Sequence, residues 1–93
     1  MNVDKAKKRI AKQVKKGFRG YPAIELTYFG QNADLATEVV VALIAEEGAE
    51  VQAQTFSSEK DVREDEAIQS VLVKIIERAN VNSVTQVDGV SIR

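Results

Sequence analysis

Four acidic residues near the middle of the chain are its best candidates for a metal site. Asp61, Glu64, Asp65 and Glu66 could present carboxylate oxygens to a magnesium ion. Their spacing matches the start of a helix more closely, because an acid followed three residues later by Glu forms a capping box, and further acids favour the helix dipole. No glycine-rich phosphate loop accompanies them. We therefore predict that these residues cap a helix and that the chain has no metal site.

The residue types most often used in catalysis are missing. The chain has 93 residues and contains no His, Cys or Trp. Without Cys there is no disulfide framework or thiol nucleophile, and without His as well zinc loses both of its usual ligand types. A small enzyme that uses carboxylates or tyrosine is the alternative, and it would need a conspicuous cleft with two acids of unequal proton affinity. We predict that the protein is not an enzyme, has no catalytic residues and requires no cofactor.

Charge is divided sharply along the chain. Residues 1–22 contain eight basic residues and one acid, whereas residues 23–93 contain five basic residues and thirteen acids. The formal net charge of −1 therefore hides a basic segment joined to an acidic one. Such an asymmetry indicates an interaction surface or a strongly dipolar molecule.

The basic segment has the periodicity of an amphipathic helix over about residues 3–17, with Gly17 near its end. Its apolar residues share one side: Val3, Ala6, Ile10, Ala11, Val14 and Phe18. Its basic residues share the other side, where they form a candidate site for nucleic acid or another anion: Lys5, Lys8, Arg9, Lys12, Lys15, Lys16 and Arg19. The sequence therefore predicts a helix with a core-facing stripe and a cationic face.

Two interpretations of this cationic face are open. It is either a solvated surface beside the acidic body, or a contact for a polyanion such as nucleic acid, an anionic membrane or an acidic protein. Base stacking needs aromatic residues among the cations, and only Phe18 and Tyr21 are near. A helix that lies on a membrane normally has bulkier apolar residues than this one.

In the acidic body, residues 21–93, apolar residues recur at the spacing of strands in some segments and at the spacing of helices in others. The expected elements are a strand over 23–29, a helix over 33–47, a strand over 50–56, a helix over about 61–80 and a hairpin over 83–93 that turns at Asp88-Gly89. The helix over 33–47 is apolar on nearly all sides, which indicates burial between layers or pairing with a second chain. We take four of its residues as a candidate interface: Val40, Val41, Leu43 and Ile44.

These elements predict a single α/β domain, with α+β as the alternative fold class. The order would be α-β-α-β-α-β-β around a small mixed sheet, with a strand–helix–strand crossover between parallel strands. The helices over 33–47 and 61–80 would share one face of the sheet. The hairpin would form an antiparallel edge, and the basic helix would be appended to this body.

The longest apolar run, residues 39–45, is far shorter than a membrane span. The basic start of the chain has no apolar stretch of the kind a secretory signal needs. We therefore expect a cytoplasmic protein without a membrane span.

Five short motifs occur in an order that resembles a set of small uncharacterised bacterial proteins. They are Gly20-Tyr-Pro, Tyr28-Phe-Gly, Leu35-Ala-Thr-x-Val-Val, Glu47-Gly-Ala-Glu and Asp61-Val-Arg-x-Asp. The resemblance covers roughly residues 19–72. It implies a bacterial cytoplasmic α/β-type domain, and it implies no activity and no site residues.

The sequence as a whole favours a non-catalytic module for protein interaction or self-association, with a homodimer as one form. This hypothesis depends on the missing catalytic residue types, the apolar segment 33–47 and the charge asymmetry. The alternative is nucleic-acid binding through the cationic face of the first helix.

Overall fold

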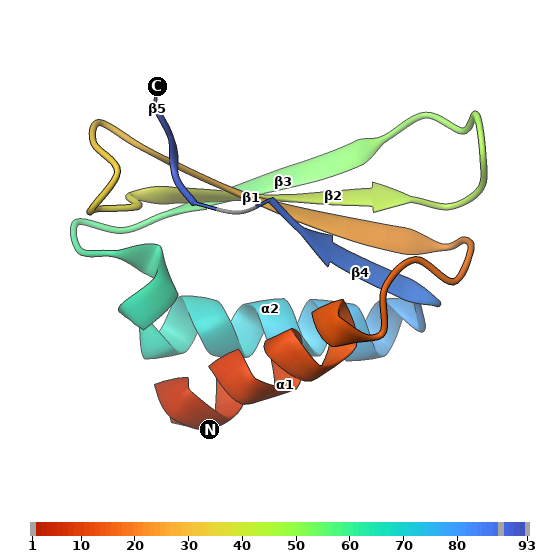
Figure 1. Cartoon of the computed structure of the whole chain (residues 1–93), viewed down its shortest axis with the longest axis horizontal. Coiled ribbons are helices and arrows are strands. Elements are labelled where there is room, and N and C mark those ends of the chain that lie inside the picture. The colour runs from red at the N-terminus through yellow and green to blue at the C-terminus, as the bar shows by residue number, and fades with distance from the viewer. Residues whose placement is uncertain (1, 88, 93) are drawn as a thin grey trace.

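The computed structural model, which describes residues 2–87 and 89–92, places two helices against one face of a mixed β-sheet (Figure 1). In chain order the elements are α1 (Val3–Lys15), β1 (Ala23–Gly30), β2 (Glu38–Ile44), β3 (Gln52–Ser57), the short 3₁₀ helix η1 (Val62–Glu64), α2 (Glu66–Ala79), β4 (Ser83–Gln86) and β5 (Ser91–Ile92). The mixed α/β class predicted from the sequence is therefore confirmed, whereas the number and order of the helices differ.

The sheet is built around β1. Strands β1, β2 and β3 form an antiparallel meander, and β4 pairs with the other side of β1 in parallel, so the order is β3-β2-β1-β4. The crossover that returns the chain to β1 is α2, which follows β3. The expected crossover joined two parallel strands that pair with each other, whereas α2 joins β3 and β4, which lie at opposite ends of this order.

The helix predicted over residues 33–47 is wrong, because the central part of this segment is strand β2. Val39 and Val41 are buried against the helices, while Val40 points to the opposite face and is half-buried. In a strand that is apolar on both faces the apolar residues are consecutive, so they also occupy the positions expected for a buried helix. Periodicity alone therefore does not distinguish the two structures in this segment. The run of β-branched residues Val39–Val41 prefers strand geometry, and pairing with β1 and β3 provides it.

The predicted C-terminal hairpin is also wrong. β4 and β5 do not pair with each other; both run parallel to β1, so that Ala23 lies opposite Ser83 and Gly30 opposite Ile92. The backbone N–H of Val87 donates to the carbonyl of Leu26 at 3.0 Å, which continues this alignment beyond β4. Asp88, half of the predicted turn, lies outside the described residues. The chain after α2 therefore satisfies its backbone groups along the second side of β1.

The two helices that share a face of the sheet are α1 and α2, in place of the predicted helices over 33–47 and 61–80 (Figure 1). The core lies between them and the sheet. Ala6 and Ile10 of α1, Leu72 of α2 and Leu26 of β1 are all buried in it. The opposite face of the sheet has no helix over it in the described part of the chain (Figure 1).

Two acidic residues before α2 cap helices, but they do not form the capping box that the spacing of Asp61 and Glu64 predicts, because Glu64 pairs with Lys7. The Asp65 carboxylate accepts a hydrogen bond from the Ile68 N–H at 3.1 Å and is the N-cap of α2. The Asp61 carboxylate accepts from the Arg63 N–H at 2.9 Å and caps η1. The helix predicted over 61–80 is therefore divided into η1 and α2.

One glycine is required by the close approach of two backbone segments. A Cβ atom added to Gly30, at the end of β1, would overlap the carbonyl oxygen of Leu35. The loop between β1 and β2 therefore folds back tightly over the end of the strand. No helix within the described residues is long and apolar enough to cross a membrane.

Candidate functional site

The first helix has the amphipathic character that the sequence predicted, and the centre of its apolar side packs into the core. Asn2 caps it by accepting the Lys5 N–H at 2.9 Å. Ala6 and Ile10, four residues apart, are buried against α2 and β4, and Val14 packs beside them. The inner side of α1 is thus fixed to the body.

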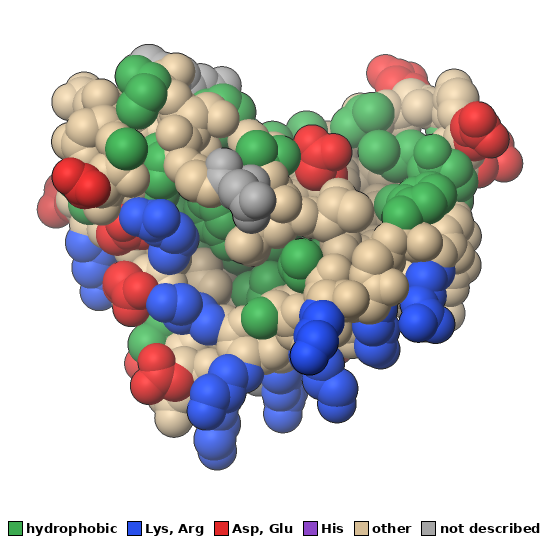
Figure 2. Space-filling view, viewed as in Figure 1, with side chains coloured by type: hydrophobic (Ala, Val, Ile, Leu, Met, Phe, Trp, Pro, Cys, Tyr) green, Lys and Arg blue, Asp and Glu red, His purple; other side chains and the backbone are tan. Residues whose placement is uncertain are grey.

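The outer side of α1 carries the cationic face. All seven residues assigned to it from the sequence are exposed: Lys5, Lys8, Arg9, Lys12, Lys15, Lys16 and Arg19. Figure 2 shows Lys and Arg side chains gathered along the lower side of the molecule, where α1 lies, and most visible acids elsewhere. Six of these cations therefore follow the outer side of α1 up to its C-cap, Lys16, whereas Arg19 lies beyond the helix end, where its side chain reaches the Lys16 carbonyl.

Few of these charges are neutralised by neighbours. Among the described residues, Arg9 is the one member of the cationic face in an ion pair, with its Nη1 3.4 Å from Glu77 Oε1. Both side chains are more than half exposed, and such pairs contribute little. Arg19 Nε donates to the Lys16 carbonyl at 3.3 Å, which leaves its charge uncompensated.

The apolar side of α1 ends earlier than predicted. The helix stops at Lys15, and Gly17 adopts a positive φ of 73°, so Phe18 lies beyond the helix and does not continue its periodicity. Phe18 is 60% exposed, and Ala11 is exposed as well. Both were expected on the core-facing stripe, and both expectations are wrong.

Phe18 instead forms an aromatic pair at the end of the cationic face. Its ring lies 5.3 Å from the ring of Tyr21, centre to centre, in an edge-to-face arrangement at 75°. The position of these two aromatics near the cations is evident from the sequence, whereas their contact was not predicted. Gly17 as a predicted helix end was the signal that could have placed Phe18 outside the stripe.

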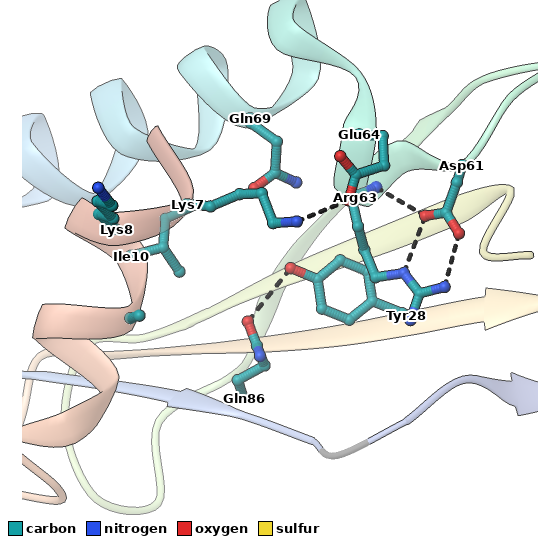
Figure 3. A pocket seen from close by; sticks show the side chains of 10 residues that line it. Lys7, Lys8, Ile10, Tyr28, Asp61, Arg63, Glu64, Gln69 and Gln86 are labelled. Carbon is teal, nitrogen blue, oxygen red and sulfur yellow. Dashed lines mark hydrogen bonds and ion pairs between the residues drawn. The ribbon is translucent and has the colours of Figure 1, made fainter. Parts of the chain in front are cut away.

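A cavity of about 450 Å³ lies beside α1, where the helix faces η1 and β1 (Figure 3). Tyr28 forms part of its wall, and the hydroxyl donates to Gln86 Oε1 at 3.2 Å. Burial raises the pKa of Tyr28 above its ordinary value of 10.0. Gln69, whose amide nitrogen donates to the Val62 carbonyl at 3.0 Å, also lines the cavity. No sequence pattern pointed to Gln69 or Gln86, because the chain separates them widely from Tyr28.

Both acids that line this cavity are engaged by cations. Lys7 Nζ lies 2.6 Å from Glu64 Oε1. Arg63 holds Asp61 through two parallel contacts, Nε to Oδ1 at 2.9 Å and Nη2 to Oδ2 at 2.6 Å. The cavity therefore offers hydrogen-bonding groups and paired charges, without a free carboxylate placed as a general base.

Asp61 also joins two loops. Its Oδ2 accepts from the Ala36 N–H at 3.2 Å, so η1 is attached to the segment before β2. The side-chain hydrogen bonds from Arg63 are the main reason that the pKa of Asp61 falls from 3.8 to about 2. The ionised carboxylate therefore stabilises the fold.

Stability is expected to decline in acid because of this group. The pKa of Asp61 is lower in the folded chain, so its contribution is present above pH 3.8 and is lost as the pH falls toward about 2. It amounts to about 2 kcal/mol at most, since solvent screens the partly exposed pair. Urea unfolding at several pH values should show a smaller loss between pH 5 and 2 for Asp61→Asn than for the wild type. Glu59→Gln, at a neighbouring exposed acid, is the control and should keep the wild-type loss.

No group of three or more acidic residues within the described part of the chain is arranged to hold a metal ion. Of the four acids considered above as magnesium ligands, Asp61 and Asp65 accept capping hydrogen bonds and Glu64 forms an ion pair with Lys7. Asp61 and Asp65 therefore cap η1 and α2 separately, whereas Glu64 is an ion-pair partner and not part of a capping box.

The four residues of the candidate interface are divided between the two faces of the sheet. Val41 is buried in the core and Leu43 packs against the core from the same side. Val40 and Ile44 alternate with them, so they lie on the face without helices and are half-buried. The structure therefore does not gather the four into one surface.

No protein-family model, no curated protein and no solved structure matches this chain. Its function is therefore inferred from the geometry described above.

Proposed function

We propose that the protein is a non-catalytic binding module that binds nucleic acid through the cationic face of α1. The observation that carries the proposal is that all seven cations are exposed along α1 and just beyond its end, with Arg9 alone in an ion pair among the described residues. Phosphate groups bind to such a surface by displacing counterions. The helix of 13 residues is about 20 Å long, which is enough to reach several consecutive phosphates.

A membrane is a poorer partner for this helix. A helix that lies in a membrane surface inserts a free apolar side below the headgroups. The centre of the apolar side of α1 is already buried, with Ala6 and Ile10 packed in the core. A ligand that needs only the charged side, such as a phosphate backbone, fits this arrangement better.

The charge of the acidic body restricts which surface of the protein nucleic acid can contact. Residues 23–93 carry an excess of acids, so they repel phosphates. Contact is therefore expected along α1 and its flanks and not across the sheet. A footprint of this kind gives modest affinity that depends strongly on salt.

Titration of the purified protein against labelled DNA and RNA tests the proposal. We expect binding at low salt, with the logarithm of the association constant falling linearly as the logarithm of salt concentration rises. Fluorescence anisotropy at several salt concentrations measures the association constant and its dependence on salt. Absence of binding to every nucleic acid at low salt would refute the proposal.

Self-association is the second candidate, and the free edge of the sheet favours it. β3 lies at the end of the sheet, and its residues Gln52–Ser57 include no charge and no proline. Natural proteins usually protect such an edge with charged residues, proline or a bulge, because it can pair with a strand of another chain. The adjacent face of the sheet, which includes Val40 and Ile44, also lacks a helix in the described structure.

A further inference from the structure

The exposed ring of Phe18 indicates which kind of nucleic acid the cationic face would bind. Phe18 is 60% exposed and lies between two members of that face, since Lys16 precedes it by two residues and Arg19 follows it. Most of this apolar residue stays in water, so burial in the fold does not account for its position. It is available to stack on the flat face of a ligand.

The segment that carries Phe18 is held in place by hydrogen bonds to the start of β4. The Arg19 N–H donates to Ser83 Oγ at 2.6 Å, and Ser83 Oγ donates to the Gly20 carbonyl at 2.7 Å. Asn82 Nδ2 donates to the Tyr21 carbonyl at 2.7 Å. Ser83 is buried, so these contacts are partly sheltered from water. The ring therefore stands on an ordered loop.

Tyr21 supports the ring from the side. The edge-to-face contact between the two rings restricts Phe18 and leaves part of its surface in solvent. An aromatic side chain that is already positioned loses less entropy when a base stacks on it. The geometry thus provides a small stacking surface at one end of the cationic face.

We propose that Phe18, supported by Tyr21, is a base-stacking site and that the ligand of the cationic face is single-stranded nucleic acid. This inference rests on the proposed function. A positively charged surface that follows the backbone, combined with an aromatic side chain that stacks on a base, is the usual way proteins bind single strands. A duplex offers the same phosphates, but its bases are stacked on one another inside the helix, so Phe18 adds nothing to duplex binding.

The test compares Phe18→Ala with the wild type on single strands and duplexes. The probes are labelled oligo(dT) and oligo(U) of about 16 nucleotides and a DNA duplex of the same length. We expect Phe18→Ala to weaken binding of the single strands by about 5- to 100-fold, as expected for the loss of one stacked base. Its binding of the duplex should stay within about twofold of the wild type, because the cations are unchanged.

Three further variants separate stacking from simple loss of an apolar side chain. Phe18→Tyr should retain the affinity for single strands, whereas Phe18→Leu, which is apolar but not aromatic, should behave like Phe18→Ala. Val51→Ala, at another exposed apolar residue, should have no effect. Because the chain contains no Trp, the fluorescence of Phe18→Trp reports on this residue alone and should be quenched when oligo(dT) binds.

The outcomes distinguish the inference from the function on which it rests. If the wild type binds single strands and Phe18→Ala binds them equally well, or if the duplex is weakened to the same extent, the stacking site is refuted while the cationic face stands. If the wild type binds neither single strands nor duplex at low salt, the proposed function fails and the inference falls with it. Circular dichroism of each variant confirms that the fold is unchanged.

Discussion

Replacing Lys8, Lys12 and Lys15 together with Gln is expected to weaken nucleic-acid binding on the order of a hundredfold at about 0.1 M salt. Each of these side chains is exposed and without an ion pair among the described residues, so each is free to bind a phosphate. For each phosphate that the variant no longer neutralises, the slope of log affinity against log salt should also fall by about 0.9 on duplex DNA. Gln has nearly the helix propensity of Lys, so α1 should remain folded.

A matched control separates the position of these charges from their number. Changing Lys60, Lys74 and Arg78 to Gln removes three charges from exposed residues outside α1. If binding depends on the cationic face, this control should keep most of the affinity and the salt slope. Equal losses in both triple variants would show that only net charge matters and would contradict a localised site. Anisotropy titrations at several salt concentrations make the comparison.

Replacing Val41 with Asp is expected to destabilise the protein by more than about 4 kcal/mol, which is enough to unfold a small domain. Val41 is 4% exposed on the inner face of β2, where a carboxylate would lose its hydration without gaining a partner. Urea unfolding followed by circular dichroism measures the change. A stable, folded Val41→Asp variant would contradict the position of β2 in the core.

The neighbouring residue provides the control for Val41. Val40 lies on the opposite face of the same strand, between Thr27 of β1 and Thr55 of β3. Val40→Asp should therefore cost about 1 kcal/mol, because the new carboxylate can reach water. Had residues 33–47 formed a helix that is apolar on nearly all sides, the two substitutions would have similar effects.

The Val40 variant also tests self-association. If copies associate through the sheet face without helices, a carboxylate at the centre of that face should separate them, and sedimentation velocity would show the change. A wild type that stays monomeric at high concentration would exclude this second candidate. Association that Val40→Asp leaves unchanged would direct attention to the edge of β3.

Local signals determined several elements of this protein. The amphipathic spacing of Ala6, Ile10 and Val14 favours a helix with one buried side whatever lies beneath it, so α1 and the part of the cationic face up to Lys16 follow from residues 3–17 alone. The alternation in residues 23–29 predicted β1 for the same reason. The predicted cap at Asp61 begins only η1, and α2 is capped four residues later at Asp65, whose hydrogen bond to Ile68 is equally local.

Only the tertiary structure decided the features that depend on distant partners. Residues 38–44 satisfy both a helical and a strand pattern, and they form β2 because β1 and β3 supply backbone partners on both sides. For the same reason β4 and β5 both pair with β1 and do not form a hairpin with each other. The cavity around Tyr28 and the loop that carries Phe18 and Tyr21 likewise depend on contacts with residues 82–86, which are distant in the sequence. Short-range spacing therefore determined the basic helix and its charge, whereas long-range hydrogen bonding determined the sheet and the surroundings of the proposed site.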